Sequence, residues 1–293
     1  MPSAYLRRRR LGAELRRIRE ERGWSVEAVA EKIFISESKI TRLENAQIRP
    51  DLGDVMNMLD LFEIERGQHD RLAKLAREAA QKGWWDRHGM AMGPRQKIAA
   101  DLESSAATIR SYDQTAMPGV MQSPEFLAAL IELDQRQGPI TYMPERMAEA
   151  REYRQREMLR VDGPTYETVL DECVIHRLDV PPEAMAAQLR HMISLVSAEE
   201  RITVRVLTHD ARVRGGFLPQ SSFYLYTFTE TGDPPMALVD TATTDLILTQ
   251  RRDVTQYAQM YDRLRKAALS PRGSVTFLGR VAKRLTEQAG STP

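Results

Sequence analysis

The chain has 293 residues, of which 42% are hydrophobic, 28% are charged and 6% are aromatic. This is ordinary globular composition, and the length suggests about two domains. The formal net charge is only +1, no apolar run approaches the ~18 residues of a membrane helix, and the basic start lacks the apolar core of a secretory signal. Cys173 is the one cysteine, which excludes an intramolecular disulfide and a cysteine zinc cage. We therefore expect a soluble cytoplasmic protein.

Charge is distributed unevenly along the chain. Residues 1–50 hold 12 Lys or Arg against 7 Asp or Glu, residues 51–100 hold 8 of each, and the remainder is mildly acidic with 22 against 26. A basic head on an acidic body indicates an anionic partner for the head. Nucleic acid and an anionic membrane surface are the two candidates, and a solvated arginine run without a partner is the alternative to both.

The head has the apolar spacing of a bundle of four or five short helices. Leu11, Leu15 and Ile18 recur at helical spacing and end at Gly23, a residue suited to a helix C-terminus. Serines in N-cap positions predict a second helix after residue 25 and a third over residues 37–45. Further helices are predicted from about residue 51 and over about residues 66–82.

The two central helices have the helix-turn-helix layout, because a turn of about three residues separates them. The motif Leu11-Gly12-x-x-Leu15-Arg16-x-x-Arg19 followed by Gly23-Trp24-Ser25 resembles the opening of Xre/Cro-type repressor domains. The segment Ser36-Glu37-Ser38-Lys39-Ile40-Thr41-Arg42-Leu43-Glu44-Asn45 resembles their recognition helix. The resemblance covers roughly residues 10–65 and implies a repressor-type regulator that binds double-stranded operator DNA as a homodimer.

The resemblance also implies which residues contact DNA. Glu37, Ser38 and Arg42 stand where the family reads base edges, and arginine pairs in bidentate fashion with guanine. Helix N-termini and flanking polar residues suit phosphates. The full predicted DNA-binding set is Ser25, Ser36, Glu37, Ser38, Lys39, Thr41, Arg42, Asn45 and Arg49. A solvated surface position is the alternative for each. Arg16 and Glu44 pair inside the domain in the family, so we assign them a structural role.

Three positions depart from the family pattern. Val26 replaces a polar residue near the start of the first motif helix, and Phe34 and Ala46 stand where glycine is common. Because left-handed backbone favours Gly and Asn, we expect Asn45 to adopt the left-handed turn in place of the missing glycine.

The remaining chain divides into a connection and a body. Residues 1–82 are predicted to form the DNA-binding domain, residues 83–94 a linker with its best candidate at 89–94, and residues 95–290 a regulatory domain that binds a ligand or partner and dimerises. Trp84 and Trp85 are interpreted as an interdomain staple, with a base-stacking platform as the alternative.

The body mixes helical and strand patterns. Helices are predicted over residues 123–135, 144–160, 182–196, 253–269 and 275–285, and strands over 166–170, 202–207, 222–228 and 236–239, with a hairpin-like turn at 229–235. These elements predict a mainly α N-terminal bundle followed by an α+β domain with a small, mostly antiparallel sheet.

Four segments of the body carry a second resemblance. They are Asp101-Leu102-Glu103-x-x-Ala106, the run from Met117 to Phe126, Arg151-x-x-Arg154-Gln155 and Val169-Leu170-Asp171-Glu172. Together they resemble the large C-terminal domain of unknown function attached to Xre-like heads in actinobacterial transcriptional regulators. The resemblance implies a regulator and transfers no chemistry to the body.

The body contains no recognisable catalytic motif. It has no Gly-rich phosphate loop, no His-Glu-x-x-His and no Gly-x-Ser-x-Gly elbow, so we expect neither an enzyme nor a cofactor nor a metal. Cys173 and His176 lie three apart, which permits a redox or metal site, but we interpret Cys173 as a buried small hydrophobe. The loop with Gly215, Gly216 and Phe217 is interpreted as plain, with an anion site as the alternative.

The sequence thus predicts a sequence-specific DNA-binding transcriptional regulator whose body senses a small-molecule effector or a small protein partner. The first alternative is an antitoxin-like or anti-sigma-like interaction module that binds a small cognate protein and regulates its own gene. The second is a body that acts as an enzyme on a nucleotide or metabolite.

Overall fold

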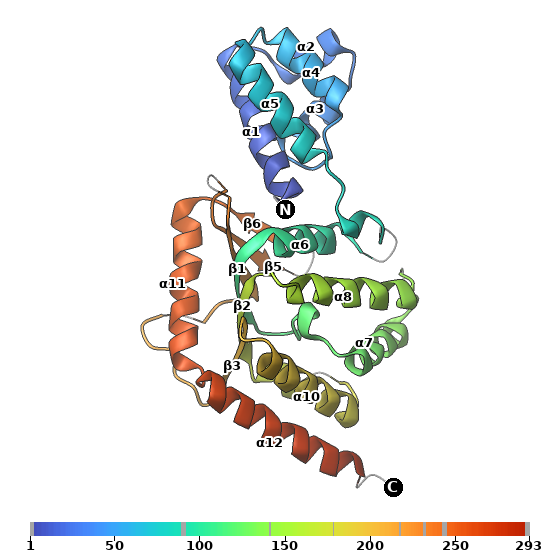
Figure 1. The fold of residues 1–293 in the computed structure, drawn as a ribbon, viewed down its shortest axis with the longest axis vertical. Coiled ribbons are helices and arrows are strands. Elements are labelled where there is room, and N and C mark those ends of the chain that lie inside the picture. The colour runs from blue at the N-terminus through green and yellow to red at the C-terminus, as the bar shows by residue number, and fades with distance from the viewer. Residues whose placement is uncertain are drawn as a thin grey trace. The chain divides into compact units, whose positions relative to one another are not determined.

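The computed structural model describes residues 3–88, 92–140, 142–177, 179–216, 218–230, 233–241 and 245–290. The chain forms two compact units (Figure 1). The first combines Met1–Arg87 with Lys97–Ser105, and the second combines His88–Gln96 with Ala106–Pro293. Within the described ranges, no helix is both long enough and apolar enough to span a membrane. Residues 89–91 of the predicted linker lie outside the described part of the chain.

The N-terminal region is helical, as predicted. Its helices are α1 (Ala4–Glu21), α2 (Val26–Ile33), α3 (Glu37–Glu44), α4 (Leu52–Leu61) and α5 (Arg66–Ala79), followed by the short 3₁₀ helix η1 (Trp84–Asp86). Their apolar faces meet in one core that includes the fully buried Leu11, Leu15, Ile40, Leu59 and Phe62. Burial of these side chains is the main force that holds the short helices together.

A residue far along the chain completes the start of α1. Asp101 lies on α6 (Pro94–Ser105), in the part of that helix that belongs to the first unit. Its carboxylate accepts hydrogen bonds from the backbone N–H groups of Ala4 at 3.1 Å and Tyr5 at 2.8 Å, and from the hydroxyl of Ser3. These bonds satisfy donors that a helix N-terminus otherwise leaves unpaired. Burial raises the pKa of Asp101, which is 2% exposed.

The second unit is built on a six-stranded sheet in the order β3-β2-β1-β4-β5-β6 (Figure 1). The strands are β1 (Ala106–Asp113), β2 (Thr165–Asp171), β3 (Ile202–Leu207), β4 (Phe223–Phe228), β5 (Met236–Asp240) and β6 (Asp245–Leu248). The pairs β1/β2 and β2/β3 are parallel, whereas β1/β4, β4/β5 and β5/β6 are antiparallel.

The prediction of a small, mostly antiparallel sheet is therefore wrong. The sheet is mixed because helices connect its parallel strands, and it is larger than expected because the four predicted strands did not include β1 or β6. β1 follows α6 without any intervening turn residue, so nothing in the sequence marks its start. The connections from β1 to β2 and from β2 to β3 each contain helices, and such crossovers produce parallel pairs. The predicted turn at 229–235 joins β4 and β5, but residues 231 and 232 lie outside the described ranges.

Helices flank both faces of the sheet. In the described part of this unit, apart from the start of α6, the helices are the 3₁₀ helix η2 (Gly119–Met121), α7 (Pro124–Gln137), α8 (Pro144–Leu159), α9 (Cys173–His176), α10 (Pro182–Ala198), α11 (Arg251–Ala267) and α12 (Pro271–Gly290). Figure 1 shows α11 on one side of the sheet and α8 and α10 on the other. The core between the sheet and α11 contains Tyr112, Phe223, Tyr261 and Leu264, each at most 1% exposed.

Candidate nucleic-acid interface

The helix-turn-helix of the first unit is formed by α2 and α3, each with a serine N-cap. The Ser25 hydroxyl accepts a hydrogen bond from the backbone N–H of Ala28 at 3.0 Å, and the Ser36 hydroxyl accepts one from Lys39 at 3.2 Å. Each serine thus fixes the start of its helix through a local bond that the sequence encodes directly. On α3, Ile40 and Leu43 are buried against the core.

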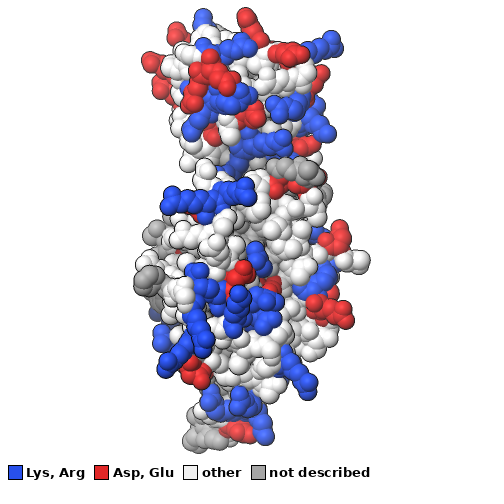
Figure 2. Space-filling model, turned by 90° about the vertical axis from the view of Figure 1, so that its left-hand side faces the viewer, with Lys and Arg blue, Asp and Glu red and all other residues white. Residues whose placement is uncertain are grey.

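The opposite face of α3 is exposed and polar. The members of the predicted DNA-binding set that are exposed are Ser25, Ser36, Glu37, Ser38, Thr41, Arg42 and Asn45. Because the buried stripe fixes the rotation of α3, the side chains of Glu37, Ser38, Thr41 and Arg42 project away from the core together. On the side of this unit that Figure 2 shows, acidic and basic side chains are interspersed.

The two other predicted cations are held by acidic neighbours. Lys39 forms an ion pair with Asp54 of α4, and that hydrogen bond raises the pKa of Lys39. Arg49 donates to Asp86 at 2.7 Å, and Asp86 also accepts from the backbone N–H of Gly83 at 3.0 Å. A phosphate would have to compete with these carboxylates for either cation.

Arg16 and Glu44 are in contact, and a third residue joins them. Arg16 Nε donates to Glu44 at 3.1 Å, and its Nη2 donates to Asn45 Oδ1 at 3.1 Å. Arg19 donates to both carboxylate oxygens of Glu44, at 2.6 and 2.9 Å, and to the backbone oxygen of Trp24 at 3.0 Å. The role of Arg19 was missed, although its spacing of three from Arg16 placed both on one face of α1.

The turns differ from expectation at one point. Phe34 is left-handed with φ 58° and its side chain is 92% exposed, so it ends α2 without packing on the core. Ala46, not Asn45, carries the left-handed turn after α3, with φ 57° against −90° for Asn45. The expectation for Asn45 was wrong, because the helix continues through its C-cap before it turns.

The basic run at residues 7–10 is partly internal. Arg7 is 5% exposed and pairs with Glu78 of α5 at 3.2 Å, and burial lowers the pKa of Arg8. These two residues therefore belong to the packing of α1. Trp84 and Trp85 contact each other edge to face, with ring centroids 5.9 Å apart, and Trp84 donates to Ser104 at 3.2 Å within the same unit.

In the second unit, polar side chains gather where the parallel strands end. β1, β2 and β3 run in one direction, so their carboxyl ends share one edge of the sheet, the usual location of ligands in such sheets. Asp113 ends β1, and it accepts hydrogen bonds from Ser111 at 2.6 Å, Thr168 at 2.8 Å and Tyr224 at 2.8 Å. Burial raises the pKa of Asp113 to about 6.

Asp171 ends β2 and holds its neighbours in place. It accepts from the backbone N–H of Cys173 at 2.9 Å and from the hydroxyl of Tyr112 at 2.9 Å. Two effects raise the pKa of the Cys173 thiol: mainly its hydrogen bond to Asp171, and to a smaller extent its burial. Cys173 is half-buried rather than buried as expected, and Phe217 of the predicted glycine loop lies outside the described residues.

The same edge carries a hollow of about 310 Å³ between the end of β1, the start of β4 and the end of β5. Its walls are polar and consist of Gln114, Thr115, Gln220, Ser221, Ser222, Asp240 and Thr241. Among the described residues, Gln114 is one whose buried side-chain oxygen accepts no hydrogen bond. A buried acceptor of this kind is costly unless a ligand or water donates to it.

Comparison with known proteins assigns both units. A family model described as a helix-turn-helix domain matches residues 10–72, and a model described as a domain of unknown function, DUF5753, matches residues 96–280. No curated protein and no solved structure matches the chain. The DUF5753 match spans more than half of the 293 residues. The chain therefore belongs to the DUF5753 family, and its helix-turn-helix domain makes it a DNA-binding regulator with a large C-terminal domain of unknown function.

Proposed function

We propose that the protein is a sequence-specific transcriptional regulator that binds its operator as a homodimer, with α3 in the major groove. The observation that carries the proposal is the polar face of α3, on which Ser38, Thr41 and Arg42 are exposed while Ile40 and Leu43 are buried. A helix presented in this way places its N-terminal side chains against base edges.

The contacts divide by chemistry. Arg42 is exposed and suits bidentate hydrogen bonding to guanine, and Ser38 and Glu37 precede it on the same helix. Ser25 and Ser36 lie at helix N-termini, where backbone N–H groups favour phosphate. One such head reads few bases, so a dimer on a near-palindrome with half-sites about 34 Å apart supplies the remaining specificity.

The second unit is proposed to sense an effector. The polar hollow at the sheet edge and the unsatisfied Gln114 oxygen favour a small polar molecule that donates a hydrogen bond. We propose binding rather than catalysis as its role, because Asp240 is, among the described residues, the one charged residue that lines the hollow, and its carboxylate pairs with Arg95. Co-purification of a small protein that occupies the second unit would favour the antitoxin-like alternative.

Binding of the full chain to the promoter beside its own gene tests the proposal. We expect a specific shift in fluorescence polarisation, two chains per DNA duplex and an affinity that falls steeply with salt. Binding that does not distinguish this DNA from mixed-sequence competitor contradicts sequence-specific regulation.

Substitution of the recognition helix tests the assigned contacts. Arg42→Ala is expected to relax base preference at one position by about 1–3 kcal/mol, because it removes a base contact. Lys32→Ala removes one charge from the exposed end of α2 and serves as the matched control. Affinities measured on a set of single-base operator variants distinguish the roles. An equal loss of affinity on all operator variants would indicate that Arg42 contacts a phosphate and not a base.

A further inference from the structure

Three potential metal ligands converge at the carboxyl ends of β2 and β3. Asp171 is the last residue of β2, Cys173 begins α9 two residues later, and His209 follows the end of β3. Parallel pairing sets Asp171 opposite Leu207, so the chain that continues from β3 brings His209 to the same edge. The register of the two strands thus brings Cys173 and His209, which are 36 positions apart in the sequence, to the same edge.

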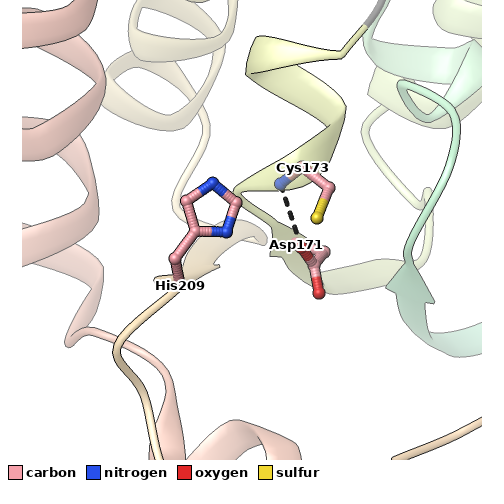
Figure 3. A group of neighbouring side chains, drawn as sticks. All are labelled: Asp171, Cys173 and His209. Carbon is pink, nitrogen blue, oxygen red and sulfur yellow. Dashed lines mark hydrogen bonds between the residues drawn. The ribbon is translucent and has the colours of Figure 1, made fainter.

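The ligand atoms of these residues are close enough to share one ion. A carboxylate oxygen of Asp171, the sulfur of Cys173 and a ring nitrogen of His209 all lie within 4.8 Å of one another. Figure 3 shows the imidazole facing the Asp171 carboxylate with the thiol beside it. Tetrahedral coordination at bond lengths of about 2.0–2.3 Å places donors about 3.3–3.7 Å apart. Small side-chain rotations therefore close the site.

The chemistry of the three donors selects the class of ion. A thiolate and an imidazole favour zinc and similar borderline cations over magnesium or calcium, which prefer oxygen alone. Asp171 and Cys173 are half-buried and His209 is exposed, so the cluster is open to solvent on one side. Three protein ligands with an accessible face are typical of zinc sites that keep a fourth position free.

Neighbouring side chains hold the ligands in this arrangement. The Tyr112 hydroxyl donates to Asp171 at 2.9 Å, and Tyr112 is 1% exposed in the core. Glu172 accepts the backbone N–H of His209 at 2.8 Å and fixes the loop that carries the imidazole. Supporting bonds of this kind orient ligands at metal sites.

We propose that Asp171, Cys173 and His209 bind one zinc-class divalent cation, with the fourth position open to water or an incoming donor. Binding replaces the thiol proton, which is released to solvent. Glu172, His176 and His209 form an overlapping group whose ligand atoms also lie within 4.8 Å of one another. The two groups share His209, and we assign the ion to the group that contains the Cys173 thiolate. It departs from the sequence-based expectation of no metal and does not depend on DNA binding.

The test uses the full chain without an affinity tag, stripped with a chelator and titrated with Zn²⁺ and, separately, with Co²⁺. We expect one equivalent of Zn²⁺ by competition with a chromophoric chelator. Stoichiometric Co²⁺ is expected to produce a thiolate-to-cobalt charge-transfer band in the near ultraviolet. Absence of that band in the unmodified chain overturns the proposal without reliance on any variant.

Variants identify the ligands. Cys173→Ser and His209→Asn are expected to lose the single Zn²⁺ equivalent, whereas His176→Asn retains it. His69→Asn, a histidine of the first unit paired with Asp60, is the matched control and also retains it. Loss in His176→Asn together with retention in Cys173→Ser would overturn the proposal and assign the ion to the overlapping group. Far-ultraviolet circular dichroism of each variant checks that its fold is intact.

Discussion

Glu44 is the charged residue on which the packing of α1 against α3 depends. Its side chain is 1% exposed and accepts hydrogen bonds from Arg19, which is 10% exposed, and from Arg16, which is 44% exposed. We expect Glu44→Ala to destabilise the first unit by about 3–5 kcal/mol, because a buried guanidinium loses the carboxylate that accepts two of its hydrogen bonds. Arg16→Ala is expected to cost at most about 1 kcal/mol, because that pair is largely solvated.

Tryptophan fluorescence during urea unfolding measures this difference. Trp24, Trp84 and Trp85 are the three tryptophans of the chain and all lie in the first unit, so the signal reports that unit. Similar losses of unfolding free energy in Glu44→Ala and Arg16→Ala would show that the Arg19 guanidinium finds other hydrogen-bond acceptors when the Glu44 carboxylate is removed.

Asp113 is expected to make the stability of the second unit depend on pH. Burial raises its pKa from 3.8 to about 6. A shift of this size changes the free energy of unfolding by about 3 kcal/mol between the protonated and the ionised carboxyl. The folded state therefore favours the protonated carboxyl. This contribution is fully present below about pH 4 and is lost as the pH rises through about 6. Asp113→Asn removes the ionisation, so the free energy of unfolding should differ less between pH 4.5 and 7 than in the parent.

Urea unfolding followed by far-ultraviolet circular dichroism at the two pH values checks this expectation. The control is Asp162→Asn, whose carboxylate is 86% exposed and should leave the pH dependence unchanged. An unchanged pH dependence in Asp113→Asn would mean that Asp113 stays ionised in the folded protein.

At the scale of elements, α1 and α3 approach closely at Gly12. A Cβ at this position would lie 2.8 Å from the backbone oxygen of Leu43 and closer still to that of Glu44. We expect Gly12→Ala to destabilise the first unit by about 1–3 kcal/mol, because the backbone of α3 must move. Gly67→Ala on α5 meets no atom within 4 Å and should stabilise by up to about 1 kcal/mol. Urea midpoints from tryptophan fluorescence give both values, and destabilisation by both variants would contradict the steric argument.

The elements that the sequence predicts well are those with local signals. Ser25 and Ser36 bond to backbone groups three residues on, so the starts of α2 and α3 follow from short segments. The strand β1 has no such signal, because its identity depends on pairing with β2 and β4, far along the chain. The same limit applies to the interface. The exposed side of α3 follows from the apolar stripe, whereas the pairing of Lys39 with Asp54 and of Arg49 with Asp86 requires the tertiary fold.

At the scale of the whole molecule, the first unit includes the segment Lys97–Ser105, which follows η1 in the sequence. Asp101 caps α1, so a fragment that ends at residue 105 should be more stable than one that ends at residue 88. One lost cap of about 1 kcal/mol lowers the melting temperature of a domain this size by about 4–8 °C. Thermal unfolding of the two fragments measures the difference, and Asp101→Ala in the longer fragment should abolish most of it. Equal melting temperatures would show that Asp101 contributes no stability to α1.

The strand order also bears on the sequence of events during synthesis. The five helices α1 to α5 contact one another within residues 4–79, whereas the central strand β1 pairs with β4, in which Thr227 lies 119 residues from its neighbour Thr108. Contacts between distant residues form slowly, because a long loop must close first. A nascent chain therefore carries a folded helix-turn-helix domain while its sheet is still incomplete, because β4, the strand that pairs with the open side of β1, begins only at Phe223.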